Sequence, residues 1–283
     1  MSYKNEDTLP QLDEQILQIT QSIKSKPSIS FDDFETKQII GSGSFSTVKL
    51  ATFKQCENPH AIALKIIPKS IILKKKNHEQ LKGELRILEE TNHPFIIQFI
   101  RSFQNETSVC FVFEFVNGGE LFNLLSAQSK FNDNWIRFYL SELLVTLRYL
   151  HSKHIVYRDL KSENVLIDNN GHIKLIDFGF SKKVDIQRAK TLCGTPEYMA
   201  PEILMKSKSG YGCSIDYWAL GILAYEMSTG TSPFSGDSPT EIFRKILKPK
   251  TVFPSEMSSD LKSLISGLLC VDPMARLGSN DVI

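Results

Sequence analysis

The sequence has 283 residues, and its 33 lysines and arginines balance 32 aspartates and glutamates to a formal net charge of +1. Such a balance gives no broad cationic face for nucleic acid or an anionic membrane. Hydrophobic residues make up 41%, and there are only 15 glycines and 12 prolines, which excludes a disordered or collagen-like chain. The length allows one large domain or two lobes.

Targeting and cysteine patterns narrow the class further. No apolar run approaches the roughly 18 residues that span a bilayer, and the first residues lack the apolar region of a signal peptide. The cysteines are odd in number and show no C-x-x-C spacing, which argues against a disulfide framework or a zinc site; they are Cys56, Cys110, Cys193, Cys213 and Cys270. We therefore expect a soluble cytoplasmic protein, with the nucleus as a second compartment, no stable membrane insertion and no nucleic-acid partner.

The N-terminal part of the chain is expected to contain a helical extension and then strands. Residues 1–30 are polar, but four apolar residues recur there at helical spacing and predict a short amphipathic helix that packs on another part; they are Leu12, Ile16, Ile19 and Ile23. Apolar and β-branched content then predicts strands at residues 34–40, 47–53, 61–67, 99–103 and 109–115. A helix over residues 77–90, with leucines 81, 85 and 88 as its apolar stripe, interrupts them.

The rest of the chain is mostly helical in pattern. Helices are predicted at residues 133–152, 215–227, 238–247 and 259–269. The second of these is apolar nearly all round, which is typical of a helix buried inside a domain. The pattern predicts an α+β chain with a small β-rich lobe at 31–116, a joint near 116–119 and a larger helical lobe at 117–283. A cleft between two such lobes is a usual place for a ligand.

Three groups of residues could carry chemistry in that cleft. Gly41-Ser-Gly-Ser-Phe-Ser-Thr-Val48 lies between two predicted strands, where glycines let the backbone approach phosphates; a tight hairpin without a ligand is the alternative. Lys65 ends an apolar strand, and Glu84 shares the inward face of the predicted helix. An unpaired buried charge is very costly, so these two residues predict an ion pair that holds a phosphate-binding lysine, with two solvated charges as the alternative.

The third group is the segment Tyr157-Arg-Asp-Leu-Lys-Ser-Glu-Asn164, which leads into a predicted hairpin over residues 165–176. A hairpin brings its ends together, so Asn164 and Asp177 are expected at the same end, with Asp159 one short loop away. Such oxygen ligands can hold Mg²⁺, which keeps several waters and bridges phosphate oxygens. An Asx-rich turn without a metal is the alternative, but it accounts for neither Lys161 nor Gly179.

Five motifs in chain order resemble those of the eukaryotic protein kinases. They are the Gly-rich loop, Ala-Leu-Lys65, Tyr-Arg-Asp159 with Asn164, Asp177-Phe-Gly179 and Ala200-Pro-Glu202. The segments TLCGTPEYMAPEI and DFGFSKKV are similar in sequence to those of the catalytic subunits of cyclic-AMP-dependent protein kinases, in the AGC group. The resemblance covers residues 31 to the C-terminus. It implies a bilobal kinase fold, with a small antiparallel β-rich lobe carrying one helix and a larger, mainly helical lobe.

The resemblance also implies transfer of the γ-phosphoryl group of ATP to a Ser or Thr hydroxyl. Asp159 would accept the hydroxyl proton and Lys161 would offset charge, while Asn164 and Asp177 would hold two Mg²⁺ ions. The implied nucleotide-binding residues are Ile40, Gly41, Ser42, Gly43, Ser44, Phe45, Ser46, Val48, Ala63, Lys65, Glu84, Glu114, Val116 and Leu166.

Substrate choice and activation are implied in the same way. Three acids correspond to positions that pair with arginines before the acceptor residue, and bidentate pairing favours Arg over Lys; they are Glu120, Glu163 and Glu226. Surface acids in water are the alternative for any one of them. The residues implied for the rest of the substrate site are Leu192, Thr195, Pro196 and Met199. An R-R-x-[ST]-hydrophobic preference follows, with Thr191 as the activating phosphosite and Arg158 and Lys182 receiving its phosphate.

Departures from the family concern the loops and the end of the sequence. Ser46 replaces the third glycine of the Gly-rich loop, and Ser162 replaces a proline. The sequence stops before the last helix and C-terminal tail of the AGC kinases. We therefore expect some apolar surface on the small lobe to be exposed to solvent. Candidate partners are Arg-containing protein substrates, a separate cyclic-nucleotide-binding regulatory subunit and a protein that donates a hydrophobic motif in trans. A kinase-fold scaffold or docking protein, inactive without the tail, is the alternative function.

Overall fold

The computed structural model describes residues 14–43, 45–55, 60–184, 189, 191, 193–205 and 210–279, with the side chains of 14–17 left out. These residues form two compact units. The first comprises the described residues up to Lys82 together with Asn92–Val116, and the second comprises Gly83–Thr91 together with the described residues from Asn117 onward. Within the described ranges, every helix is too short or too polar to cross a membrane.

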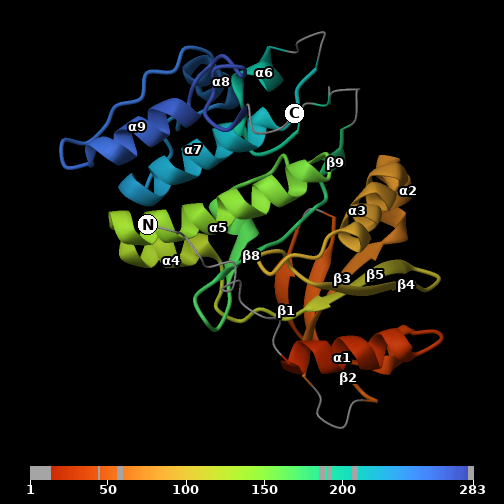
Figure 1. Ribbon diagram of the computed structural model, residues 1–283. Helices are drawn as coiled ribbons and strands as arrows, with labels where there is room; N and C mark the ends of the chain where they lie inside the picture. Colours follow the sequence, from red (N-terminus) through yellow and green to blue (C-terminus); the bar gives the residue numbers. More distant parts are fainter. Residues whose placement is uncertain are drawn as a thin grey trace. The chain divides into compact units, whose positions relative to one another are not determined.

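The first unit is built on a five-stranded antiparallel sheet (Figure 1), and the five predicted strands are confirmed. In the spatial order β1-β2-β3-β5-β4, the strands are β1 Phe34–Ser42, β2 Thr47–Phe53, β3 Ala61–Pro68, β5 Ser108–Glu114 and β4 Phe99–Gln104. Successive side chains of a strand point to opposite faces. In β3, Ile62 and Leu64 are fully buried on one face, so Ala63 and Lys65 lie on the other.

Helix α1 (Glu14–Ser25) covers the face of the sheet that carries Ile62 and Leu64, as Figure 1 shows. Ile19 and Ile23 are 1% and 0% exposed and belong to the same hydrophobic core as the strands, as expected of the predicted amphipathic helix. Leu12, also part of that prediction, lies outside the described residues. Arg101 of β4 donates to the carbonyl oxygen of Ile23 at 3.2 Å. A side chain of the sheet thus satisfies a carbonyl that the end of the helix leaves without an intrahelical partner.

Two further helices follow β3. Helix α2 (Lys69–Lys75) was not predicted, because seven residues give under two full turns. The small lobe was expected to carry a single helix, and α2 corrects that expectation. Lys76 ends α2 in the left-handed conformation, with φ of 52°. Helix α3 (His78–Glu90) begins one residue later than predicted, and its last part, from Gly83, belongs to the second unit.

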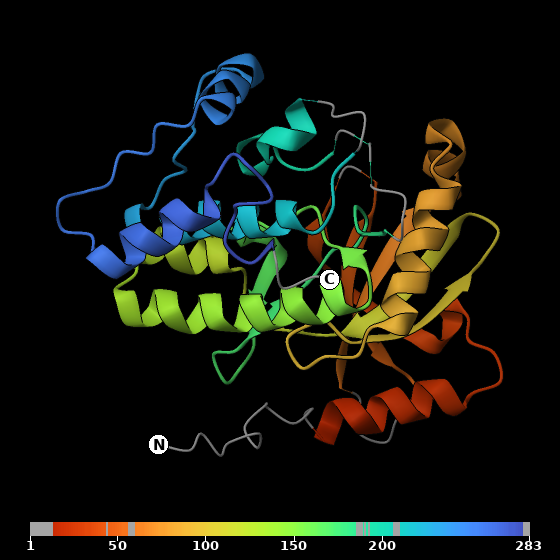
Figure 2. The same cartoon turned by 45° about the horizontal axis from the view of Figure 1, so that its top comes forward.

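The second unit is mainly helical. Its helices are α4 Leu121–Gln128, α5 Asp133–Ser152, α6 Pro201–Leu204, α7 Ser214–Thr229, α8 Pro239–Leu247 and α9 Ser259–Leu268. Figures 1 and 2 show α5, α7 and α9 side by side, with α7 in the middle. Gly221 allows this packing, because a Cβ there would lie 2.8 Å from the Cβ of Leu268 in α9. The buried position of α7 agrees with its predicted all-round apolar pattern.

Short strands and a hairpin complete the second unit. Strand β6 (Ile155–Val156) pairs with β9 (Lys182–Lys183), and β7 (Val165–Ile167) pairs with β8 (Ile173–Leu175). The predicted hairpin at 165–176 is confirmed, and Gly171 turns it with φ of 85°. Three-residue 3-10 helices lie at Phe31–Asp33 in the first unit, and at Ser162–Asn164 and Pro196–Tyr198 in the second.

A buried ion pair ties the residues after α9 to α6. Arg276 is 1% exposed, and its Nη1 and Nη2 donate to the two carboxylate oxygens of Glu202 at 2.7 and 2.9 Å. Arg276 also donates to the carbonyl oxygens of Ser214 and Cys270 at 2.8 and 2.9 Å. A buried charge is tolerated only when it is paired and hydrogen-bonded in this way.

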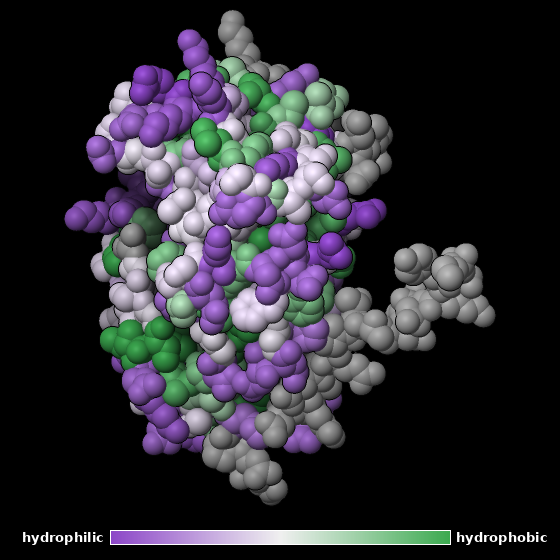
Figure 3. Space-filling model, turned by 90° about the vertical axis from the view of Figure 1, so that its left-hand side faces the viewer, coloured by the Kyte–Doolittle hydropathy of each residue, from purple (hydrophilic) through white to green (hydrophobic). Residues whose placement is uncertain are grey.

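The surface combines hydrophilic side chains with separate apolar ones. Figure 3 shows hydrophilic residues over much of the face that it draws, with smaller hydrophobic areas between them. Helix α5 contributes exposed apolar side chains at Trp135, Phe138 and Val145, which are 42%, 42% and 44% exposed. Single exposed apolar residues of this kind are common on soluble proteins.

The packing of α1 gives a testable prediction of stability. Replacing Ile23 by Ala leaves a cavity in the core and should lower the free energy of unfolding by about 2–5 kcal/mol. Leu73→Ala, on α2 of the same unit, is the matched control, because Leu73 is 76% exposed. Its effect should stay within about 0.5 kcal/mol. Urea unfolding followed by circular dichroism measures both, and equal effects would contradict the docking of α1.

Candidate active site

The Gly-rich loop joins β1 and β2 in the first unit. Gly41 pairs with Val48, and the N–H of Gly43 donates to the carbonyl oxygen of Ser46 at 2.9 Å. A Cβ on Gly41 would meet only Val48, at an ordinary contact distance of 3.6 Å. Packing within this unit therefore does not require glycine at 41, which favours a role in approaching a ligand. Ser44 lies outside the described residues.

The other nucleotide-site candidates of the first unit lie on its strands or just beyond them. Lys65 is half-buried and stands in register between Val48 of β2 and Phe111 of β5. Glu114, at the end of β5, is 2% exposed, and its carboxylate accepts the N–H of Gln98 at 2.8 Å. The structure brings these candidates together on one sheet and its loops; they are Ile40, Gly41, Ser42, Gly43, Phe45, Ser46, Val48, Ala63, Lys65, Glu114 and Val116.

A compact hydrogen-bonded cluster surrounds Asp159 in the second unit. The Asp159 carboxylate is 5% exposed and accepts the Thr195 hydroxyl at 3.1 Å. Lys161 lies 3.4 Å from the same carboxylate and donates to the Thr195 oxygen at 3.1 Å. Asn164 Nδ2 donates to the Asp159 backbone oxygen at 2.8 Å and to its carboxylate at 2.9 Å. The cluster thus joins residues 157–164, which we call the catalytic loop, to the segment that carries Thr195.

Burial controls the protonation of Asp159. Removal from water raises the pKa of this carboxyl above its ordinary value, against the opposing effects of the Lys161 charge and the hydrogen bonds from Asn164 and Thr195. The negative charge of Asp177 raises this pKa further. A carboxylate with a raised pKa holds a proton more tightly, which suits a group that accepts one during a reaction.

Asp177 lies next to Asn164, as the hairpin predicts. The N–H of Ile176 donates to the Asn164 carbonyl oxygen at 2.9 Å, so the residue after it leaves the hairpin beside Asn164. Asp177 is exposed and has φ of 56°. A Cβ on Gly179 would lie 3.2 Å from the Asp177 carboxylate and 3.6 Å from the buried Glu84 carboxylate, so both acids face this glycine. Lys65 belongs to the first unit and Glu84 to the second, so their ion pair stays a prediction.

These residues fit a magnesium ion that shares its coordination with a ligand. Asn164 commits Nδ2 to Asp159, which leaves Oδ1 as its ligand atom, and Asp177 offers an exposed carboxylate. Among the described residues, no group of three or more His, Cys, Asp or Glu could hold a metal. Mg²⁺ suits such a sparse set because it binds one or two side chains together with waters and substrate phosphates.

Asp216 of α7 holds the catalytic loop and was missed in the sequence. It is 1% exposed, and its two carboxylate oxygens accept the backbone N–H groups of Tyr157 and Arg158 at 2.9 and 2.8 Å. His151 Nε2 lies 2.8 Å from the same carboxylate. An acid near the start of an otherwise largely apolar helix was the available signal, because such a group needs buried partners.

The charge of Glu163 affects the pKa values of two other carboxylates of the predicted substrate site. Burial raises the pKa values of Glu120 and Glu226, and the charge of Glu163 raises both further. The Tyr198 hydroxyl donates a hydrogen bond to Glu226. An isolated bridge also pairs Glu120 with Leu166, a nucleotide-site candidate on β7. A cationic ligand would relieve the mutual repulsion of these acids.

The segment before Thr195 lies against the catalytic loop. Thr191 is exposed, and its carbonyl oxygen accepts the Tyr211 hydroxyl at 2.6 Å. The Arg158 guanidinium donates to the carbonyl oxygen of Phe180 and, at 3.2 Å, to the Tyr211 hydroxyl. Lys182 is exposed on β9. Thus Arg158 and Thr191 share one partner, Tyr211, which the sequence did not reveal.

The remaining substrate-site candidates surround the 3-10 helix Pro196–Tyr198. Pro196 is half-buried, and Met199 is 8% exposed. Leu192 lies outside the described residues. A separate cavity of about 420 Å³ in the second unit is lined mainly by apolar residues of α5, α7 and α9, among them Leu140, Leu220 and Leu264. It contains none of the predicted site residues.

Comparisons with known proteins agree with this geometry. The protein kinase domain family matches residues 34–283. The chain is 44% identical over 253 residues to the human cAMP-dependent protein kinase catalytic subunit PRKX, covering 89% of this chain and 69% of that protein. It is 43% identical over 247 residues to the Dictyostelium discoideum cAMP-dependent protein kinase catalytic subunit, covering 87% and 37%. It is 40% identical over 257 residues to the Xenopus laevis RAC-beta serine/threonine-protein kinase B, covering 90% and 52%.

The match and the architecture confirm the expected kinase fold, with an antiparallel sheet in one unit and helices in the larger one. Proteins of this family use ATP and a divalent metal, generally Mg²⁺. The named relatives are Ser/Thr kinases of the AGC type. The chain therefore belongs to the protein kinase family, as a Ser/Thr kinase of the AGC group.

Proposed function

We propose that this kinase transfers the γ-phosphoryl group of ATP to Ser or Thr residues that follow arginines, in intracellular signalling. The observation that carries the proposal is the buried Asp159 carboxylate, with Lys161 beside it and hydrogen bonds from Asn164 and Thr195. The same group of residues offers a proton acceptor, a cation and a ligand for a metal. A scaffold without activity would need none of these groups in this arrangement.

Each residue of the cluster has a proposed task. Asp159 orients the substrate hydroxyl and accepts its proton, while Lys161 offsets negative charge on the phosphoryl group in transfer. Asn164 and Asp177 would hold two Mg²⁺ ions, whose charge would offset that of the phosphate oxygens. Lys65, oriented by Glu84, would grip the α- and β-phosphates, and the Gly-rich loop would cover them.

The apolar residues proposed to contact the adenine ring are Ile40, Val48, Ala63 and Leu166. Glu114 and Val116 would supply backbone hydrogen bonds to its edge. The half-buried state of Val48, Ala63 and Leu166 supports this assignment, because each offers apolar surface that a ring can cover. The remaining loop residues, Ser42 and Phe45 among them, would lie over the phosphates.

The preference for arginine follows from the three coupled acids. Burial and the charge of Glu163 make ionisation of Glu120 and Glu226 costly, and a substrate guanidinium would offset that cost while pairing with two oxygens at once. Arginine presents a planar fork of donors, which lysine lacks. Pro196 and Met199, with Leu192, would contact an apolar residue after the acceptor. The favoured substrate is R-R-x-[ST]-hydrophobic.

Thr191 is the proposed activating phosphosite. It is exposed, and Arg158 lies on the other side of the Tyr211 hydroxyl that binds the Thr191 carbonyl. A phosphate at Thr191 would bring about −2 charge and could pair with Arg158 and Lys182. The names of the relatives suggest a cyclic-nucleotide-binding regulatory subunit as a partner. The proposed place of action is the cytoplasm, with the nucleus as a second compartment. A donor of a hydrophobic motif in trans is a further proposed partner.

A peptide assay tests the proposal. The kinase should transfer ³²P from labelled ATP to a peptide containing R-R-x-S, and Asp159→Asn should lower kcat by at least about 100-fold because the proton acceptor is lost. Thermal unfolding of the variant controls for its fold. Transfer by Asp159→Asn at the original rate would contradict the role of Asp159. Equal turnover of acidic and Arg-containing peptides in an array would contradict the preference for arginine.

Substitution of one acid tests that preference directly. Glu226→Gln should lower kcat/KM for the Arg-Arg peptide by at least about tenfold, through the loss of a charge-assisted pair, and leave the KM for ATP unchanged. Glu241→Gln is the matched control, since Glu241 is paired with Lys245 on α8. Steady-state kinetics with both peptide and ATP varied distinguish the two sites. A similar loss in both variants would refute the role of Glu226.

The pH dependence of kcat/KM tests Asp159 as the base. Its pKa is raised by burial, so activity should fall as acidification protonates the carboxylate, at a pH above the ordinary value for aspartate. The Thr195 hydroxyl lowers this pKa by donating a hydrogen bond to the ionised form. Thr195→Val removes that bond and should therefore move the acid limb to higher pH. An acid limb at the same pH, or at a lower one, would count against this assignment.

A further inference from the structure

We propose that Tyr211 is a positioning residue that keeps the activation segment docked on the catalytic loop before Thr191 carries a phosphate. The activation segment here means described residues 189, 191 and 193–199. Tyr211 does this by joining the Thr191 backbone to Arg158, the residue that precedes Asp159. The inference rests on the proposed function in one respect, the assignment of Thr191 as the phosphorylated residue.

Tyr211 contacts the activation segment at several points. Its N–H donates to the Ala189 carbonyl oxygen at 2.9 Å and its carbonyl accepts the Ala189 N–H at 3.0 Å. Its hydroxyl donates to the Thr191 carbonyl oxygen at 2.6 Å and accepts from Arg158 Nη1 at 3.2 Å. The Cys193 sulfur lies 3.7 Å from the same hydroxyl. Because Tyr211 is 4% exposed, these contacts are shielded from water.

The segment has little freedom to settle elsewhere on the loop. Gly194 has φ of 101°, and a Cβ there would lie 2.9 Å from the Arg158 carbonyl oxygen, so the two backbones run close together. The cavity between them measures about 10 Å³, roughly one water molecule at most. Thr195 follows directly and donates to the Asp159 carboxylate. A shift at Thr191 would therefore move a group that touches the proposed catalytic base.

The hydroxyl of Tyr211 performs both halves of the link. Burial raises the pKa of Tyr211 to about 12, although the neighbouring Arg158 charge opposes the rise. The hydroxyl therefore keeps its proton at neutral pH. It donates a hydrogen bond to the Thr191 carbonyl oxygen while its own oxygen accepts one from Arg158. A phosphate on Thr191 would offer Arg158 a stronger, charge-assisted partner. The contribution of Tyr211 should accordingly be largest in the unphosphorylated enzyme.

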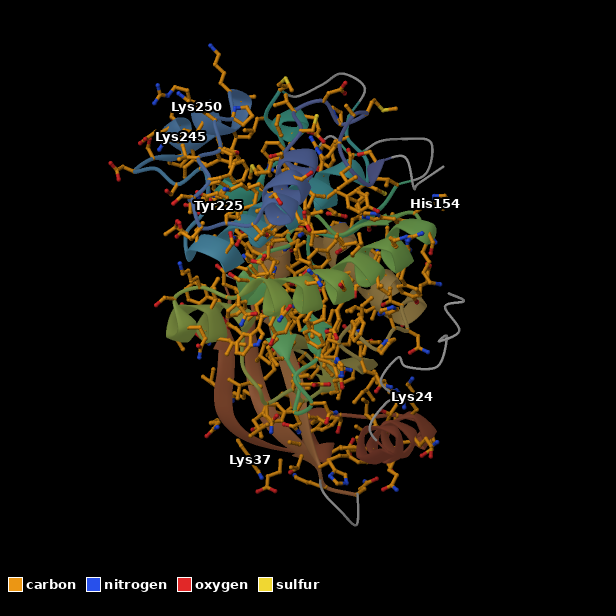
Figure 4. The ribbon with its side chains drawn as sticks, turned by 60° about the vertical axis from the view of Figure 1, so that its left-hand side comes forward. Lys24, Lys37, His154, Tyr225, Lys245 and Lys250 are labelled. Atoms are coloured by element: carbon orange, nitrogen blue, oxygen red, sulfur yellow. The ribbon has the colours of Figure 1, made fainter. Side chains whose placement is uncertain are left out.

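Kinetics on paired variants test the proposal. Tyr211→Phe is compared with Tyr225→Phe, whose hydroxyl donates to the Val252 carbonyl oxygen at 2.8 Å on another part of the second unit (Figure 4). Each is measured in the Thr191-phosphorylated enzyme and in the Thr191→Ala background. In the Thr191→Ala background, Tyr211→Phe should lower kcat/KM for the peptide about three- to tenfold, mainly by raising the peptide KM. This factor corresponds to the loss of one neutral hydrogen bond. The loss should be smaller in the phosphorylated enzyme, and Tyr225→Phe should match its parent.

An equal loss in both backgrounds, or no loss in the Thr191→Ala background, would overturn the proposal. A second readout needs no catalysis. Iodoacetamide should alkylate Cys193 faster in Tyr211→Phe than in Tyr225→Phe, with the half-buried Cys270 as internal reference by mass spectrometry. An unchanged Cys193 rate would overturn the proposal. If Thr191→Ala alone retains full activity, the phosphosite assignment fails, while the alkylation rate still decides the role of Tyr211.

Discussion

The catalytic loop depends on one buried carboxylate, that of Asp216. Arg158 has φ of 73°, a conformation that costs about 1–3 kcal/mol in a residue other than glycine. The two N–H bonds that Asp216 accepts from Tyr157 and Arg158 hold the backbone in that conformation. His151 fixes the carboxylate from α5, and α7 is buried along nearly its whole length. The loop thus inherits the rigidity of the helical core.

The positions around Asp159 follow from this support. The backbone turn at Arg158 directs its guanidinium toward Phe180 and Tyr211 and leaves the next side chain, Asp159, facing Asn164 and Thr195. The loop therefore places a carboxylate, an ammonium and an amide close together within a span of six residues. Helix α7 contributes twice to the second unit, since it carries both Asp216 and Glu226, an acid of the proposed substrate site. One helix would thus support both the catalytic loop and the proposed recognition of arginine.

Much of this arrangement was accessible from the sequence, because it depends on local patterns. Apolar and β-branched content predicted the five strands, and the hairpin geometry predicted that Asn164 and Asp177 would lie at the same end. Helix α2 was missed because its seven residues carry too little periodicity. Tyr211 and Asp216 were missed because their partners lie 18 to 65 positions away along the chain. Contacts over such separations depend on packing, which no local pattern encodes. The Lys65–Glu84 ion pair was also inferred from the residues themselves, and it stays a prediction because the two residues belong to different units.

The Arg276–Glu202 pair bears on how the protein is made. Its two members are 74 positions apart, and ribosomes add about 5–20 residues per second. A nascent chain therefore carries Glu202 for roughly 4–15 s before its arginine is even synthesised. During that interval burial of the ionised carboxylate in α6 is unfavourable, since an unpaired buried charge is costly. We therefore expect the region that follows the activation segment to reach its final packing late, once Arg276 has been made.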